Sequence, residues 1–170
     1  MKRELQHTLF LKYHVFFDWL KDDESKLIQP MQFGIECGDG WYWLLDNLMN
    51  SIYRYQSYNK HLKGNEEFIH VKQIKEKFGG LEFYFNGGNE TIRGMVWLAS
   101  NQSYTVCEYC GTTENVGRTA GWISVMCKPC YDKDTKLGYR EWKPNDNKRL
   151  KKLARIKTLI NEDKNKTTKR

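Results

Sequence analysis

Four cysteines restrict the fold of this chain more than any other feature of its sequence. They form two Cys-x2-Cys pairs separated by sixteen residues: Cys107, Cys110, Cys127 and Cys130. Two residues between the members of a pair allow one tight turn to present both thiolates to one ion, and two such turns complete a tetrahedron around zinc. The spacing therefore predicts a single Zn²⁺ ion bound by four sulfurs.

Four thiolates fill the coordination sphere of zinc, which favours a structural ion over a catalytic one. Gly111 suits the positive φ that such a turn often needs. Residues 116–125 can form a small hairpin turning near Ala120 and Gly121, followed by a short helix over 131–136. These elements are typical of a treble-clef or ribbon-like zinc module. Two disulfides or an iron–sulfur cluster are the alternatives for the cysteines.

The chain before the cysteines predicts an α+β fold, with helices packed on a small antiparallel sheet. Residues 68–85 alternate in polarity around Gly79 and Gly80, as β-hairpins do. Asp39 is expected to cap one helix and Asn89 to open another. Apolar periodicity predicts helices over residues 4–20, 41–55, 91–102 and 149–160. Three parts are predicted: an α+β body over 1–105, a zinc module over 106–139, and a basic helix with a disordered tail over 140–170.

Positive charge is concentrated at the C-terminal end of the 170-residue chain. Residues 131–170 carry 14 Lys and Arg against 6 Asp and Glu, whereas residues 1–106 carry 12 against 13. The basic segment follows a predicted break at residues 143–147, and its cations are candidates for contacts with nucleic-acid phosphates. These candidates are Lys148, Arg149, Lys151, Lys152, Arg155 and Lys157. An acidic groove in a protein is an alternative partner for them.

The sequence has no run of eighteen apolar residues, so no transmembrane helix is expected. The N-terminal segment has no small-residue cleavage site and carries charges, which argues against a signal peptide. We therefore expect a cytoplasmic protein, and five cysteines in a reducing compartment indicate metal binding before disulfides.

Two further groups of residues are candidates for contact with a ligand or partner. Cys37 lies in a glycine-rich turn and could be a nucleophile, although a buried thiol is the preferred interpretation. Acidic side chains near it, together with Asp46, could bind metal or transfer protons. The predicted hairpin also mixes basic and aromatic residues, and its aromatic side chains could stack on bases or simply pack on the helices. The ligand or partner candidates are Glu36, Asp39, Trp41, Lys75, Lys77 and Tyr84.

Three motifs occur in a fixed order: Gly-Asp-Gly-Trp at 38–41, Val-Lys-Gln-Ile-Lys-Glu-Lys-Phe-Gly-Gly-Leu-Glu-Phe-Tyr at 71–84, and the two cysteine pairs with Gly121-Trp122 before the second. Over residues 33–131 the chain resembles a family of small uncharacterised proteins from bacteriophages and bacteria. The resemblance implies a phage accessory protein that acts inside a bacterial cell by engaging a host component. It implies no catalytic residues.

The leading hypothesis is a non-enzymatic, zinc-stabilised binding protein that engages a host protein and blocks a host process. A second hypothesis is a nucleic-acid-binding protein that uses the basic C-terminal helix. A third is a small enzyme, or a sequesterer of a nucleotide-like ligand, with a pocket around residues 36–41. The third hypothesis requires that these side chains lie outside the hydrophobic core.

Overall fold

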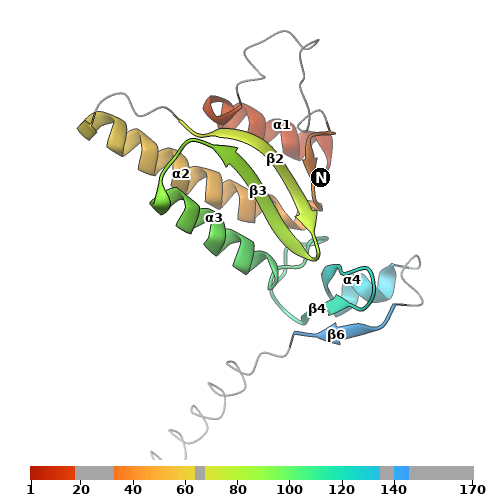
Figure 1. Cartoon of the computed structure of the whole chain (residues 1–170). Helices are drawn as coiled ribbons and strands as arrows, with labels where there is room; N and C mark the ends of the chain where they lie inside the picture. The colour runs from red at the N-terminus through yellow and green to blue at the C-terminus, as the bar shows by residue number, and fades with distance from the viewer. Residues whose placement is uncertain (18–32, 64–67, 135–139, 146–170) are drawn as a thin grey trace, which may run out of the picture.

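The computed structural model describes residues 1–17, 33–63, 68–134 and 140–145 of the chain (Figure 1). Two small sheets organise these residues, one in the body and one near the cysteines. The elements are α1 (Arg3–Lys12), η1 (His14–Phe16), β1 (Ile35–Glu36), η5 (Asp39–Trp41), α2 (Tyr42–Lys63), β2 (His70–Lys77), β3 (Gly80–Asn86), α3 (Glu90–Ser103), β4 (Val116–Thr119), β5 (Val125–Cys127), α4 (Lys128–Lys133) and β6 (Trp142–Pro144).

The main sheet has the order β1-β2-β3. β2 and β3 form the predicted antiparallel hairpin, and the register shifts between Val71 and Gln73. This bulge places Ile74 on the same buried face as Val71, although the two residues are three apart. Sequence analysis missed β1, a two-residue strand that pairs parallel with β2 at Ile35 and Glu36. A strand this short carries too little alternation to be recognised.

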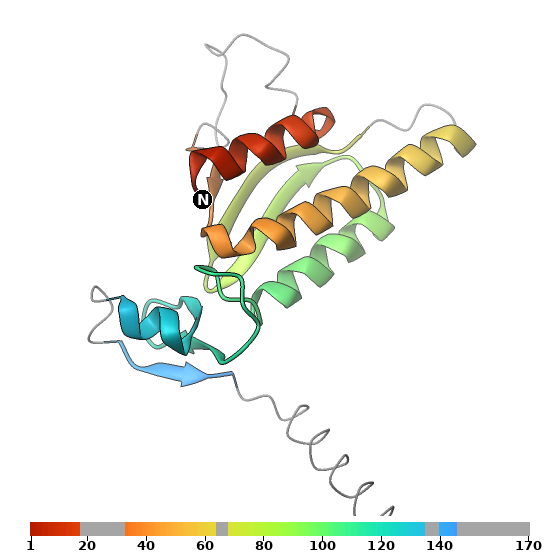
Figure 2. The same cartoon turned by 180° about the vertical axis from the view of Figure 1, so that it is seen from behind.

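Three helices cover one face of the main sheet (Figure 2). Leu45, Met49 and Ile52 of α2 are buried between the helices and the inward side chains of the hairpin, such as Leu81. α3 begins where expected, because the side chain of Asn89 accepts a hydrogen bond from the backbone N–H of Ile92. The predicted α+β class, with helices on a small antiparallel-rich sheet, is confirmed.

Several predicted boundaries need correction. The first helix ends at Lys12, and a 3-10 turn follows it. The hairpin turns at Phe78 and Gly79, both with positive φ, so Gly80 belongs to β3. The predicted break at 143–147 contains part of β6, which pairs with β4.

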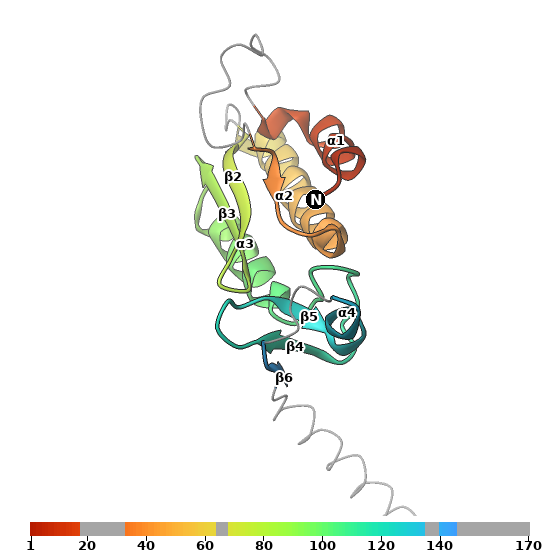
Figure 3. The ribbon, with the colours of Figure 1, turned by 90° about the vertical axis from the view of Figure 1, so that its right-hand side faces the viewer.

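The second sheet has the order β5-β4-β6 and lies beyond the β2–β3 turn (Figure 3). β4 and β5 are the hairpin predicted between the cysteine pairs. α4 starts directly after Cys127, three residues earlier than predicted, with a proline in its first turn. The predicted helix over 149–160 lies outside the described residues. No described helix combines the length and apolar character needed to cross a bilayer.

Candidate functional site

The four predicted metal ligands converge in the structure. The sulfur atoms of Cys107, Cys110, Cys127 and Cys130 all lie within 4.8 Å of one another. The Sγ atoms of Cys110 and Cys127 are 3.7 Å apart. Zn–S bonds of about 2.3 Å in a tetrahedron require sulfur–sulfur distances of roughly 3.8 Å, so the cluster has the size that a tetrahedral ion needs. The four cysteines could hold one metal ion with a structural role.

Two backbone turns position these sulfurs. In the first, the N–H of Gly111 donates to the carbonyl of Cys107 at 2.8 Å, and the N–H of Cys107 donates to the carbonyl of Thr112. In the second, Cys127 ends β5 and Cys130 lies in α4. The N–H of Lys128 donates to the carbonyl of Asn115 and so joins the two halves of the module.

Burial and neighbouring groups shift the pKa values of three of the four cysteine thiols. Burial raises the pKa of Cys107. Burial, together with the neighbouring sulfur of Cys127, raises the pKa of Cys130. At Cys110 burial is outweighed by hydrogen bonds from the Thr112 backbone and the neighbouring cysteines, so its pKa is lowered. Ligation deprotonates all four groups and neutralises their mutual repulsion, which couples metal binding to proton release.

The Gly-Asp-Gly-Trp turn docks the body onto the first cysteine turn. The N–H of Gly40 donates to the carbonyl of Glu108 at 2.8 Å, and the N–H of Gly38 donates to the Glu108 carboxylate at 2.8 Å. The indole N–H of Trp41 donates to the carbonyl of Val106 at 3.0 Å. A Cβ at Gly40 would lie 2.2 Å from the carbonyl oxygen of Cys107, so only glycine fits there.

This docking corrects the prediction of a ligand pocket around residues 36–41. Trp41 is fully buried and Cys37 is 6 % exposed. Burial raises the pKa of Cys37 to about 12, the opposite of an activated nucleophile. Asp39 was expected to cap a helix, but its side chain makes no capping hydrogen bond within the described residues. It accepts instead from the backbone N–H of Lys2 at 2.7 Å. Glu36 is exposed and accepts from the side-chain amide of Gln73.

Asp46, a candidate for acid–base work, joins two helices instead. Its carboxylate accepts from the Tyr13 hydroxyl and from the Lys12 ammonium, both at 2.7 Å. Burial raises the pKa of Tyr13 to about 12, and its bond to Asp46 adds to the rise. The group therefore fixes α1 against α2.

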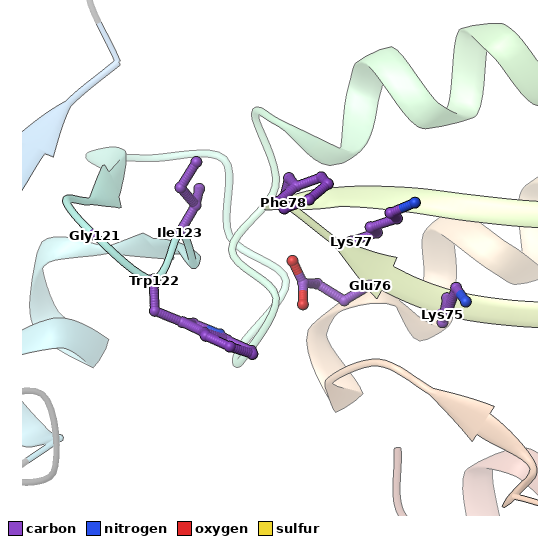
Figure 4. Close-up of a pocket in the computed structure, with 7 residues that line it drawn as sticks. All are labelled: Lys75, Glu76, Lys77, Phe78, Gly121, Trp122 and Ile123. Atoms are coloured by element: carbon purple, nitrogen blue, oxygen red, sulfur yellow. The ribbon is translucent and has the colours of Figure 1, made fainter.

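A groove of about 320 Å³ separates the β2–β3 turn from the β4–β5 connection (Figure 4). Phe78 and Trp122 stand on its two sides and are 73 % and 71 % exposed. The groove is lined by Lys75, Glu76, Lys77, Phe78, Gly121, Trp122 and Ile123. A Cβ at Gly79 would lie 2.8 Å from the Ile123 side chain, so body and module are in close contact beside the groove.

The carboxylate of Glu76 points into the space between Trp122 and Phe78 in Figure 4. One of its oxygens accepts from the N–H of Gly79, which holds the side chain in place. A second carboxylate, Glu108, is near. Burial raises the Glu108 pKa, the hydrogen bond from Gly38 opposes the rise, and the charge of Glu76 adds to it. Glu76 and Glu108 are therefore neighbouring carboxylates, while two cations, Lys75 and Lys77, also line the groove.

Three predicted partner residues lie on the hairpin beside the groove. Lys75 and Lys77 line it, and Tyr84 is partly exposed on β3. The ammonium of Lys75 lies 5.5 Å from the centre of the Tyr84 ring, and that of Lys77 lies 5.6 Å from the centre of the Phe78 ring. In Figure 4 both lysines project away from Trp122.

Sequence analysis missed Glu76, Phe78 and Trp122 as site residues. A phenylalanine before glycine at a hairpin turn, where asparagine is common, was the available signal. The six cations predicted to bind nucleic acid, Lys148 to Lys157, lie outside the described residues. The chain matches no protein-family model, and no curated protein or solved structure matches it either.

Proposed function

We propose that this is a non-enzymatic, zinc-stabilised binding protein that engages a host protein through the groove between its hairpin tip and its zinc module. The observation that carries this proposal is the pair of exposed aromatic side chains, Phe78 and Trp122, on the two sides of that groove. Exposed aromatics in a concave site are the side chains that contribute most to protein–protein binding.

Zinc is the ion proposed for the four cysteines. Thiolate ligands favour zinc over the hard cations magnesium and calcium, and a tetrahedron of four sulfurs is the usual structural zinc site. In this proposal the ion holds the β4–β5 connection, and with it Trp122, in position beside the hairpin. The ion therefore shapes the binding surface without reacting.

The resemblance to phage and bacterial proteins supports a bacterial host protein as the partner, met in the bacterial cytoplasm. On this interpretation the protein is a phage accessory protein that blocks a host process by occupying a surface of its target. The near-neutral charge of residues 1–106 supports a protein partner for the body.

Nucleic-acid binding is the second candidate function, because residues 131–170 carry a net charge of +8. Such binding would use the basic C-terminal segment, and it would weaken steeply as salt rises, since each phosphate contact releases counterions.

Native mass spectrometry of the purified full chain tests the metal and the second candidate together. One zinc per chain, lost with a chelator, is the expected result. Co-purifying nucleic acid that leaves as salt rises would favour the second candidate.

Capture from host lysate then tests the first candidate function. We expect one protein to be retained by wild type and by Trp43→Ala, and lost with Trp122→Ala. Trp43 is a matched control because it is 68 % exposed on α2. Equal retention by all three proteins, or no specific protein, would contradict the proposal.

A further inference from the structure

We propose that the groove binds a basic side chain of the partner, above all an arginine, with its guanidinium stacked on the Trp122 indole and hydrogen-bonded to the Glu76 carboxylate. This inference rests on the proposed function, because it names the chemistry of the partner segment that enters the same groove.

The conformation of Phe78 is the first indication that the groove is a binding site. Phe78 has a φ of 51° and Gly79 a φ of 80°, the signs that a type I′ turn requires. A bulky residue in the left-handed region is strained, and the ring is mostly exposed, so it gains little from burial. Asparagine would suit the turn better, so we infer that the phenylalanine is there to contact a ligand.

The charge of the groove selects the ligand. The Glu76 carboxylate points into it, and only one of its oxygens has a hydrogen bond in the described structure, from the N–H of Gly79. A cation that reaches the second oxygen is also attracted by nearby Glu108. A phosphate or carboxylate ligand would meet these negative groups instead. Lys75 and Lys77 also line the groove but project away from Trp122, so the end of the groove between the two rings, where the Glu76 carboxylate lies, complements positive charge.

The two aromatic rings differ in what they can still bind. Phe78 already has the ammonium of Lys77 over its ring, whereas the Trp122 ring is 71 % exposed, with Arg140 beside it in a second hollow. Indole attracts cations more strongly than the other aromatic rings do. A guanidinium suits this place better than an ammonium, because its planar group can stack on the indole while its edge donates hydrogen bonds to a carboxylate.

Titration of the zinc-loaded full chain with N-acetyl-arginine amide, followed by NMR, tests the inference. The neutral isostere N-acetyl-citrulline amide is the matched ligand. We expect arginine to shift the indole N–H of Trp122 and the amide of Gly79 with a dissociation constant on the order of millimolar. Citrulline should bind at least about fivefold more weakly, the factor that about 1 kcal/mol of cation–π attraction represents.

Variants of the chain show which residues bind the arginine. Glu76→Gln retains an acceptor for the N–H of Gly79, so the turn is kept while the charge is lost. Both Glu76→Gln and Trp122→Ala should reduce arginine binding at least about fivefold, and Trp43→Ala should leave it unchanged. Equal shifts with citrulline, or full binding by Trp122→Ala, would overturn the proposal.

The same titration distinguishes two other possible occupants of the groove. If the chain's own basic segment fills the groove, a chain ending at residue 145 will bind arginine and the full chain will not, and an external partner is then excluded. If a single-stranded oligonucleotide shifts Trp122 and arginine does not, the site is for nucleic acid and the inference fails. A host protein captured through Trp122, without arginine binding, would contradict this inference alone and leave the proposed function standing.

Discussion

The body and the cysteine module of this protein are stabilised in different ways. The body buries a continuous core that includes whole apolar stripes of α2 and the hairpin. The buried cluster of the module holds five residues in the described structure, and two of them, Cys107 and Cys127, are candidate metal ligands. Apolar burial alone can support the first region, whereas a cluster this small needs a metal or an equivalent crosslink.

The two regions meet where the glycine turn of the body touches the first cysteine turn of the module. Gly38 and Gly40 donate to Glu108, and Trp41, which is buried in the body, donates to Val106. The docking therefore combines one backbone–backbone bond with two bonds that involve side chains, at the turn that carries Cys107 and Cys110. We therefore expect loss of the proposed ion to affect the groove between Phe78 and Trp122 before it affects the body.

Removal of a metal ligand should produce the largest difference between the regions. Cys110→Ser and Cys127→Ser should abolish hydrogen-exchange protection over residues 107–134, because structural zinc contributes roughly 10 kcal/mol or more to the folding of small zinc domains. Protection of α2, β2 and β3 should remain. Hydrogen exchange read by mass spectrometry gives both results in one experiment.

The matched control is Cys37→Ala, which removes the one cysteine outside the cluster. It should leave the module protected. If both cluster variants keep native protection over residues 107–134, the structural role of the ion is wrong.

The cysteine spacing and the hairpin alternation were enough to predict the cluster and the main fold, because both signals are local. The docking was not predictable in the same way. Gly38 and Asp39 fit a helix-capping turn equally well in sequence, and only the approach of Glu108, seventy residues away, decides their role. Contacts between distant segments leave no local period in a sequence.

Gly40→Ala should break the docking and have the second-largest effect. Its Cβ would meet the Cys107 carbonyl at 2.2 Å and the Gly111 nitrogen at 2.4 Å, both backbone atoms that cannot move alone. We expect a loss of about 3 kcal/mol in the free energy of unfolding, at the upper end for overpacked sites. Urea denaturation with probes in each region should also show the module unfolding separately.

The matched glycine is Gly94 in α3, where a Cβ meets nothing within 4 Å. Gly94→Ala should stabilise the protein by about 0.5–1 kcal/mol, as alanine does in a helix. A Gly40→Ala protein as stable as Gly94→Ala would show that the two regions do not depend on this close approach.

Alkaline pH should affect the body through Cys37. Its thiol has a pKa near 12 in the folded protein against 9.0 for an ordinary thiol. Stability from this group is complete below pH 9 and is lost as pH rises toward 12, because the unfolded chain releases the proton first. At pH 10 the loss is about 1.4 kcal/mol. The free energies of unfolding of wild type and Cys37→Ala, measured by urea titration, should converge by this amount between pH 8 and pH 10. If the two values change in parallel with pH, the thiol is exposed to water in the folded protein.

Among the changes at the boundary between body and module, Phe78→Asn should have the smallest effect, and it should stabilise the protein. Asparagine tolerates the left-handed φ of 51° that Phe78 adopts, and Asn-Gly is a preferred type I′ turn. We expect a gain of about 1 kcal/mol in the free energy of unfolding, the cost of a bulky side chain in this conformation. The urea midpoint should rise with an unchanged slope.

Tyr84→Asn is the comparison for this gain, since Tyr84 is a partly exposed aromatic on β3 of the same hairpin, where asparagine is disfavoured. It should destabilise the protein. If Phe78→Asn also destabilises it, the ring is part of the packing between body and module. If the variant is more stable but loses half or more of its arginine affinity, the strained phenylalanine costs stability and contributes to binding. That strain then lies where the body meets the cysteine module.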